Sequence, residues 1–556
     1  MSIATAESSQ TRAEARVSTF AVLIGIALFA FAIRIAWLMW HGPSEITWDG
    51  AEYARIAANL IAGHGYVGLR GTTMFVFPPL YPLAILALLP LGGDVAQAGL
   101  DVSLLSGAVL IFPVYGMAAT AYGRKAGYAA AVIVAVLPFT VQLSTVVLAD
   151  MLFLTLAATG THFLLRVENE RRVADAIACS VAFALAYLTR PEGRLLWALA
   201  LGIVLLQSVP RADRRHGVAV MLALLLPFFV LASPYVVFLT SHSNHVRVEG
   251  KSLLNLDIGL RMNRGMSYTV AADGIDRNLN QTGPELDQAY YFEPPGRSQP
   301  ALGAIAAFGL QNLVRHVREI VHVIISPLCG TAVFCLLAVF GFLAGPWSRR
   351  RVWNQAILVA YGTVIAIALA SVFHFWDRYF VGFIPLLIVW AANGIAVLED
   401  AIAARFRVRR LGFAPLALAG IFLIALLFSN KVRFVDDSQS LVERTAGQWL
   451  AQNGGAGSRI LSISDQSVFY AGGTWWMLPY APDDGTALRY VNKIDPDYVV
   501  LDSDYAAERP YVTKWLAAGI PDRRARVVYT HGDVGGPTVA IVRWAPQVSG
   551  TAAGVR

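Results

Sequence analysis

The strongest constraint on this chain is a series of apolar runs, each long enough to cross a bilayer. Hydrophobic residues make up 56% of its 556 residues and charged residues only 15%, which is too apolar for a soluble globular protein. Since a spanning helix needs about 20 mainly apolar residues, we predict an α-helical polytopic membrane protein with about eleven spans. The predicted spans are residues 18–40, 97–121, 127–147, 149–165, 173–189, 192–209, 218–240, 321–346, 354–373, 379–398 and 411–429.

Lys and Arg residues gather in alternate loops, and such loops are retained in the cytoplasm. The basic clusters are Arg12/Arg16, Arg124/Lys125, Arg166/Arg171/Arg172, Arg211/Arg214/Arg215, Arg349/Arg350/Arg351 and Arg405/Arg407/Arg409/Arg410. We therefore predict a cytoplasmic N-terminus in a bacterial inner membrane, with segments 41–96, 241–320 and 430–556 on the periplasmic or extracellular side. The net charge of +7 follows from this retention and is no evidence for nucleic acid.

The first span is predicted to remain as a helix, because residues 41–45 offer no small-residue cleavage site for a signal peptidase. The cysteines, Cys179, Cys329 and Cys335, fall within or near predicted spans. The external part therefore has no disulfide framework, and no Cys/His pattern indicates zinc.

The chain divides into a transmembrane module, 1–429, and a soluble α/β domain, 430–556. External loop 41–96 has the pattern of short helices on the membrane surface. Most of loop 241–320 is polar and irregular, as in a lid or binding loop. In the soluble domain we expect helices at 441–452 and 510–518 and strands at 459–463, 498–501, 526–529 and 538–542. We find no internal repeat.

Two carboxylates lie where predicted spans meet the outside. Asp49 and Glu52 have the spacing of a helix capping box, but Asp49 is also placed to accept a proton as a general base. Asp150 begins the predicted span 149–165. A carboxylate costs roughly 2.5–3.5 kcal/mol at the bilayer centre and less at the interface, so it usually has a partner or a function. Asp150 could cap its helix or act beside Asp49.

Arginines on the external side run against the positive-inside bias. Arg190 and Arg194 could pair locally with Glu192, and Arg378 with Asp377. Alternatively, their guanidinium groups could hold a phosphate by bidentate contacts and stabilise a phosphate leaving group. Two such sites at similar depth favour the phosphate interpretation.

Further cations and aromatic residues are weaker candidates. Arg55 and Arg70 are the basic residues of loop 41–96, and Lys251 opens a lid-like segment. Each of these cations could simply be solvated. Trp475–Trp476 could stack on a sugar, although a buried aromatic pair is the simpler explanation.

In the order and spacing of these motifs, the chain resembles the GT-C superfamily of membrane glycosyltransferases, in the branch of protein O-mannosyltransferases and aminoarabinose lipid A transferases. The resemblance implies an inverting transferase that takes a sugar from a polyprenyl phosphate at the outer face, with Asp49 as base and Asp150 nearby. It implies donor phosphate contacts by Arg190, Arg378, Arg70 and Lys251, and substrate contacts by Glu52, Tyr53, Tyr81, Glu192 and Tyr379. The residues that carry it are Asp49 to Tyr53, Gly63 to Tyr66, Pro78–Pro79, Asp150 to Phe153, Thr189 to Arg194, and Arg378–Tyr379 with Pro385.

The chain departs from this branch at two positions. Lipid A transferases of the family carry a lysine before the Pro-Pro pair, where this chain has Phe77. Asp49 is followed by Gly50 rather than by a second acid, and without a DxD pair we predict no metal or other cofactor, although the sequence leaves a divalent ion open.

We therefore predict a hexosyl- or pentosyltransferase whose partners are a polyprenyl-phosphate-linked sugar, a glycan, lipid or protein acceptor, and membrane lipid. The alternatives are a transporter or flippase of a lipid-linked sugar and a non-catalytic cell-envelope assembly protein. Transporters tend to show repeats and midplane polar sites, whereas the charges here gather at the external face.

The predicted topology can be tested by labelling with a membrane-impermeant thiol reagent applied from outside. Cysteines introduced near positions 270 and 500 should react, and cysteines near 213 and 350 should not. Labelling near 213 from outside would reverse the predicted orientation.

Overall fold

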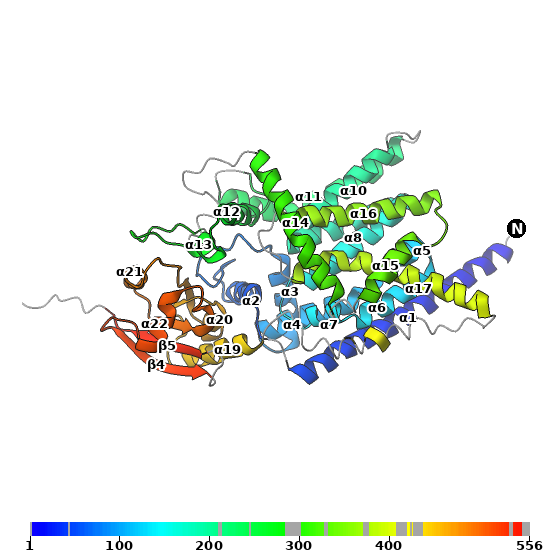
Figure 1. The fold of residues 1–556 in the computed structure, drawn as a ribbon. Helices are drawn as coiled ribbons and strands as arrows, with labels where there is room; N and C mark the ends of the chain where they lie inside the picture. The colour runs from blue at the N-terminus through cyan, green and yellow to red at the C-terminus, as the bar shows by residue number, and fades with distance from the viewer. Residues whose placement is uncertain are drawn as a thin grey trace, which may run out of the picture.

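The computed structural model describes residues 3–42, 45–208, 214–243, 246–283, 302–326, 332–370, 377–406, 420–422, 425, 437–532 and 538–546. A long helical body carries a small sheet at one end, and helix α1 begins at the opposite end (Figure 1). The helices of the body are α1 (Ile3–His41), α2 (Trp48–Ile61), α3 (Leu80–Leu88), α4 (Val95–Val109), α5 (Ile111–Tyr122), α6 (Arg124–Val136), α7 (Pro138–Leu143), α8 (Asp150–Glu170), α9 (Val173–Thr189), α10 (Gly193–Ser208), α11 (Arg214–Ser241), α12 (Ser252–Asn263), α13 (Tyr268–Asp273), α14 (Leu302–Ile325), α15 (Ala332–Leu343), α16 (Arg349–Ala370) and α17 (Ile384–Phe406), with short 3-10 helices η1 (Leu89–Leu91) and η4 (Asp377–Phe383).

The apolar helices confirm the predicted membrane class. By length and composition, five helical stretches in the described part of the chain are able to cross a membrane: Ser18–His41, Val95–Tyr122, Arg215–Ser241, Arg349–Ala370 and Asp377–Arg405. Shorter apolar helices cover Leu80–Leu91, Val173–Thr189, Gly193–Leu206 and Val333–Leu343. The predicted number of eleven spans is not confirmed.

Several predicted boundaries were wrong. The predicted span 321–346 is divided between α14 and α15, and the proline at 327 disfavours one continuous helix across this stretch. Span 127–147 is broken into α6 and α7 at Pro138, which lies at the first position of α7. Within loop 241–320, the part up to residue 300 was expected to be irregular, but it contains α12 and α13. Cys329 and most of the predicted span 411–429 lie outside the described residues.

Small residues let the central helices approach closely. Helix α6 packs against α1, α5 and α17, and its buried face includes Ala126, Ala129, Ala130 and Ala131. In a lipid environment such small side chains favour helix association through close van der Waals packing. The alanine-rich sequence of α6 therefore explains its place at the centre of the body.

Residues 437–546 form the C-terminal unit, a mixed sheet with helices. The strands β1 (Arg459–Ser462), β2 (Thr474–Met477), β3 (Tyr498–Asp502), β4 (Ala525–Gly532) and β5 (Thr538–Trp544) lie in the order β2-β1-β3-β5-β4. Strand β1 is parallel to β2 and β3, whereas β5 is antiparallel to β3 and β4. The remaining elements are α19 (Asp437–Gln452), α20 (Gln466–Ala471), α21 (Asp484–Ile494), α22 (Pro510–Ala518) and the 3-10 helix η6 (Ser503–Tyr505).

The four predicted strands and two predicted helices of this unit are present, but β2, α20 and α21 were missed. Strand β2 has only four residues, and its tryptophans were interpreted as an aromatic pair. Trp475 is buried, as expected, whereas Trp476 is 38% exposed.

The C-terminal unit is docked on segment 41–96, where α20 lies beside α2 (Figure 1). The backbone N–H of Trp475 donates to Leu69 O at 2.8 Å. The Arg55 guanidinium donates to the carbonyl oxygens of Val468 and Phe469 in α20. Arg55 therefore anchors the unit to α2 and is not a solvated loop charge.

Helix α2 starts two residues earlier than a capping box at Asp49 requires, so the predicted cap was wrong. The N-cap is Thr47, whose Oγ1 accepts from the N–H of Gly50 at 2.9 Å. The same hydroxyl donates to the carbonyl oxygen of Val147 at 3.2 Å. Thr47 thus ties the start of α2 to the segment that precedes α8, and Asp49 is left without a capping role.

Gly50 allows this close approach between α2 and the backbone at Val147. A Cβ atom at position 50 would lie 2.5 Å from Val147 O and 2.8 Å from Thr47 Oγ1. Because the nearest atom belongs to the backbone, it cannot move aside cheaply. An acid directly after Asp49 has no space here.

Gly50→Ala should therefore destabilise the protein by about 1–3 kcal/mol, the usual cost of overpacking. The measurement is thermal unfolding in lipid nanodiscs. Gly202→Ala in α10 is the matched control, since nothing lies within 4 Å of a Cβ at that position. Equal unfolding temperatures for both variants would contradict the close approach.

Candidate functional site

Two adjoining pockets meet at Asp49, at the end of the helical body that carries the C-terminal unit. The arginine pocket has a volume of about 850 Å³ including its open mouth, and the tryptophan pocket about 770 Å³. The arginine pocket is lined by Asp49, Tyr53, Val76, Phe77, Pro78, Asp150, Thr189, Arg190, Pro191, Glu192, Arg194, Leu195, Lys251, Asn255, Ala368 and Tyr379. The tryptophan pocket is lined by Trp48, Asp49, Glu52, Arg70, Thr73, Met74, Phe75, Val76, Phe77, Lys251, Leu254, Asp465 and Trp475.

Asp49 is paired with Arg378, not with a group on its own helix. Arg378 Nη2 donates to Asp49 Oδ2 at 2.6 Å, and both side chains are three-quarters buried or more. Burial would raise the pKa of Asp49, but the charges of Arg378, Lys251 and Arg190 outweigh burial and lower the pKa to about 2. Asp49 is therefore ionised at neutral pH, in the form that a proton acceptor needs.

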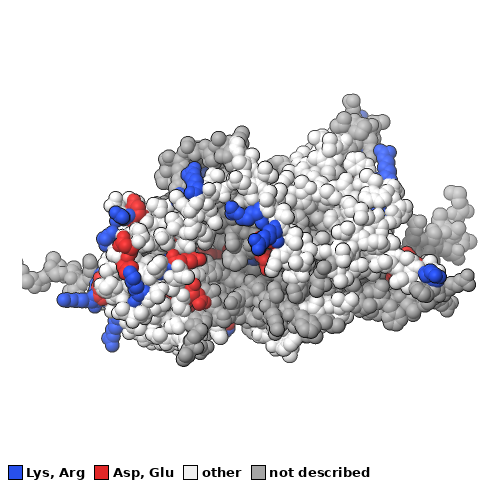
Figure 2. Space-filling model, viewed as in Figure 1, with Lys and Arg blue, Asp and Glu red and all other residues white. Residues whose placement is uncertain are grey.

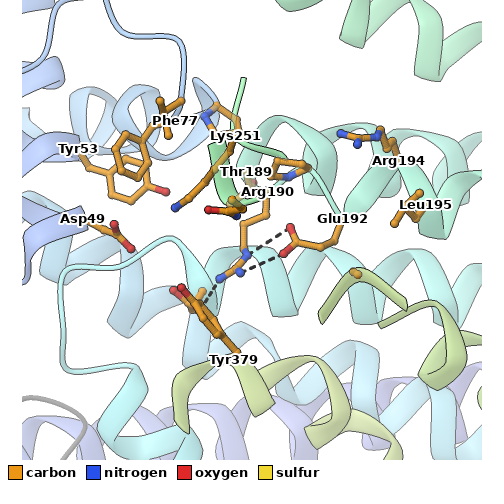
Figure 3. A pocket seen from close by; sticks show the side chains of 16 residues that line it. Asp49, Tyr53, Phe77, Thr189, Arg190, Glu192, Arg194, Leu195, Lys251 and Tyr379 are labelled. Atoms are coloured by element: carbon orange, nitrogen blue, oxygen red, sulfur yellow. Dashed lines mark hydrogen bonds and ion pairs between the residues drawn. The ribbon is translucent and has the colours of Figure 1, made fainter. Parts of the chain in front are cut away.

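Arg190 is held between two carboxylates. Its Nη1 donates to Asp150 Oδ1 at 2.5 Å, and its Nη2 donates to Glu192 Oε1 at 3.1 Å. The expected pair with Glu192 is thus present, but Asp150 is a second partner from a different helix. No side-chain hydrogen bond of Asp150 caps α8. Figure 3 shows Arg190 and Glu192 facing each other in the pocket, with Asp49 on the other side of Arg190.

Lys251 points into the same pocket (Figure 3). Its Nζ lies 5.2 Å from the centre of the Phe77 ring. Among the described residues, no carboxylate lies within ion-pair distance of this ammonium group. Lys251 is therefore a cation available to an incoming anion, and Phe77 is the aromatic surface beneath it.

The aromatic candidates have different positions. Tyr53 and Tyr379 line the arginine pocket, and the Tyr379 ring lies under both Arg190 and Arg378 at 5.8 and 5.3 Å. Tyr81 lines neither pocket. It is fully buried, and its hydroxyl donates to Gly99 O at 2.8 Å, so Tyr81 supports Tyr53 by packing.

Glu52 and Arg70 line the tryptophan pocket instead. Glu52 accepts from the N–H of Leu69 at 2.9 Å and therefore does not complete a capping box. The Arg70 guanidinium lies over the Trp475 ring at 4.6 Å. Of the predicted donor phosphate residues, Arg190 lines the arginine pocket, Arg70 lines the tryptophan pocket and Lys251 lines both. Arg378 lines neither pocket and reaches the site through its ion pair with Asp49. Arg194 lines the arginine pocket and has Glu249 at 4.0 Å.

Two buried charged residues were missed in the sequence, one that lines a pocket (Asp465) and one that lines neither (Arg34). Asp465, in the loop after β1, reaches the tryptophan pocket from the C-terminal unit. Arg34 is fully buried in α1 and donates to Ser144 Oγ and to the carbonyl oxygens of Ala30 and Val134. An intramembrane arginine is rare enough to be a signal for a functional or positioning role.

The charged side chains on the face shown in Figure 2 gather on the C-terminal unit and at its junction with the helical body, and most of the body surface is uncharged. This distribution suits a body within lipid and a polar end in water. Within the described part of the chain, no group of three or more His, Cys, Asp or Glu side chains is arranged to hold a metal ion.

Comparisons with known proteins point to one kind of fold. The family model described as dolichyl-phosphate-mannose-protein mannosyltransferase matches residues 77–238. A search of curated proteins finds no match to the chain. The oligosaccharyltransferase of Archaeoglobus fulgidus, solved with Zn and sulfate, has a TM-score of 0.59 and 14% identity over 94% of this chain and 73% of its own.

ArnT from Cupriavidus metallidurans, solved with undecaprenyl phosphate, has a TM-score of 0.54 and 14% identity over 94% of this chain and 98% of its own. Archaeal oligosaccharyltransferase AglB, solved with an inhibitory peptide and a dolichol-phosphate, has a TM-score of 0.51 and 14% identity over 93% of this chain and 73% of its own. These proteins are GT-C glycosyltransferases. The chain therefore has the GT-C glycosyltransferase fold, as the resemblance in its sequence predicts.

Proposed function

We propose that this protein is an inverting glycosyltransferase of a bacterial inner membrane that moves a hexosyl or pentosyl group from a polyprenyl phosphate to an acceptor at the outer face. The observation that carries the proposal is one pocket in which an ionised carboxylate, Asp49, lies beside the cations Arg378, Arg190 and Lys251. A sugar bound by its phosphate to these cations would present its anomeric carbon near Asp49. The neighbour ArnT, solved with undecaprenyl phosphate, supports a lipid phosphate as the donor.

The reaction is a single displacement. The acceptor oxygen forms a bond to the anomeric carbon, and the bond from that carbon to the phosphate oxygen breaks. The electron pair of this bond leaves with the polyprenyl phosphate, and the acceptor proton goes to Asp49. One displacement inverts the anomeric configuration.

The charges of the arginine pocket explain how the donor can activate Asp49. Before binding, three carboxylates (Asp49, Asp150 and Glu192) lie near four cations (Arg190, Arg194, Arg378 and Lys251), of which Arg194 has Glu249 as its partner. Lys251 is the cation without an ion pair among the described residues, so it is placed to meet the donor phosphate first.

With the donor bound, Arg378 can pair with either of two anions, Asp49 or the donor phosphate. As the phosphate leaves it gains a second negative charge, while Asp49 loses its charge by taking the acceptor proton. Movement of Arg378 toward the phosphate removes the main attraction that lowers the pKa of Asp49, and burial then raises that pKa. Asp49 becomes a better base when the donor is in place.

Arg190→Lys or Arg378→Lys should weaken binding of undecaprenyl phosphate roughly 10-fold, because lysine keeps the charge but loses bidentate geometry. The measurement is a binding titration of the purified protein in nanodiscs. Arg166→Lys is the matched control, because Arg166 pairs with Asp175 at the far end of α8. Unchanged affinity in both pocket variants would assign these arginines to ion pairs alone.

Asp49→Asn should reduce sugar transfer by roughly 10²-fold or more while undecaprenyl phosphate still binds, since asparagine cannot take the proton. Thermal stability should fall through the loss of the ion pair with Arg378, but helix α2 keeps its N-cap because Thr47 supplies it. Asp49→Glu should recover little, since a shift of about 1 Å can itself cost on the order of 10²-fold. Asp101→Asn, at an exposed position on α4, is the control. Full activity of Asp49→Asn would remove Asp49 from the mechanism.

A further inference from the structure

Donor binding in the arginine pocket does not account for the tryptophan pocket. This second pocket opens between α2 and the C-terminal unit and shares Asp49, Val76, Phe77 and Lys251 with the first. Asp49 thus lies where a molecule in either pocket can reach it. A displacement reaction needs both donor and acceptor beside Asp49, and the second pocket offers a separate place for the acceptor.

The topology of the C-terminal sheet places a crevice of the kind that binds ligands next to the tryptophan pocket. Strand β1 lies between β2 and β3 in the sheet. The connection after β1 leads to β2 on one side, and the connection after β3 leads to β4 on the other side. The two connections therefore separate at the carboxyl ends of the parallel strands β1 and β3. Ligands of open α/β sheets bind in the crevice at such a point. Asp465 follows β1 and Tyr505 follows β3. The Trp48 ring at the start of α2 lies 6.1 Å from the Tyr505 ring, so the crevice faces α2.

Two buried carboxylates line the pocket. Asp465 is 2% exposed, and its Oδ1 has no hydrogen-bond partner among the described residues. Glu52 is 7% exposed and accepts one backbone hydrogen bond, from Leu69. An unpartnered buried carboxylate oxygen is costly. The lost hydrogen bonds can be regained from a ligand that brings hydroxyl donors.

Aromatic surface completes the pocket. The Trp48 side chain is 37% exposed, which leaves part of its indole open to a ligand. Trp475 is buried and carries Arg70 over its ring. Among the described residues, no carboxylate lies within ion-pair distance of Arg70. The tryptophan pocket therefore combines two carboxyl groups as hydrogen-bond acceptors, the apolar face of an indole ring, and the Arg70 guanidinium as a donor.

We propose that the tryptophan pocket binds the acceptor and that this acceptor is a sugar, whose hydroxyls donate to Asp465 and Glu52 while its ring packs on Trp48. The proposal rests on the proposed function for the role of Asp49. A sugar offers several hydroxyl donors and an apolar C–H face within one ring, which matches this lining. A peptide acceptor offers a single side-chain hydroxyl at the reacting residue and uses these two carboxylates poorly.

The test is direct binding, which requires no turnover. Methyl and octyl glycosides of common hexoses and pentoses, and a serine/threonine peptide, are titrated against the full chain in nanodiscs and followed by saturation-transfer NMR. At least one glycoside should bind the wild type. Asp465→Asn and Glu52→Gln should each weaken this binding roughly 10-fold, because an amide NH₂ group replaces one carboxyl oxygen that accepts from a sugar hydroxyl. Preference for octyl over methyl glycosides would indicate a lipid-linked acceptor sugar.

Undecaprenyl phosphate binding, measured on the same samples, separates this proposal from the proposed function. It should change by less than about twofold in both variants, since neither carboxylate lines the arginine pocket. Asp484→Asn, at a distant ion pair with Lys514, is the matched control and should alter neither titration. The proposal is overturned if no glycoside binds, if only the peptide binds, or if glycoside affinity is the same in Asp465→Asn as in the wild type. Failure of the wild type to bind undecaprenyl phosphate would overturn the donor assignment instead.

Discussion

The site depends on the mutual neutralisation of charges buried at one end of a membrane protein. Asp49 and Arg378 neutralise each other, and Arg190 is shared by Asp150 and Glu192. Breaking a buried pair by removing one partner usually costs 3–5 kcal/mol, although partial exposure reduces that cost here. These ion pairs therefore help to fix the ends of α2, α8, α9 and η4 relative to one another. An incoming phosphate must compete with carboxylates for the same cations.

The helix α2 connects the two halves of the proposed chemistry. Thr47 and Gly50 hold its first turn against Val147, near the start of α8. It also contacts the C-terminal unit, through Arg55 and α20. Asp49 is thus placed between a pocket rich in arginines and a pocket that includes a residue of the C-terminal unit. In this account the C-terminal unit is part of the substrate site rather than an appendage.

The sequence was sufficient to find most of the charged residues of the site, because charges at the ends of apolar runs are expensive and therefore conspicuous. It was not sufficient to pair them. The local alternative paired Arg378 with its neighbour Asp377, whereas its partner is Asp49, 329 positions away. Such pairs follow from helix packing, which local patterns do not encode.

Other errors have local causes. The spacing of Asp49 and Glu52 fits a capping box, but Thr47 competes for the same helix start and also gains Val147 O as an acceptor. Tyr81 matched the family pattern, yet it packs beneath the site. Asp465 was missed because a single aspartate between a strand and a helix has no distinguishing pattern. The fold class was predictable because apolar runs and the alternation of basic loops extend over most of the chain.

The most direct measurement is sugar transfer by the purified wild-type protein from a panel of polyprenyl-phosphate sugars with the label in the sugar. We predict release of free polyprenyl phosphate that depends on an added acceptor, and a product whose anomeric configuration is opposite to that of the donor. Retention of configuration would contradict the single displacement at Asp49. Absence of release from every donor in the panel, under conditions in which undecaprenyl phosphate binds, would contradict the assignment of this site to glycosyl transfer.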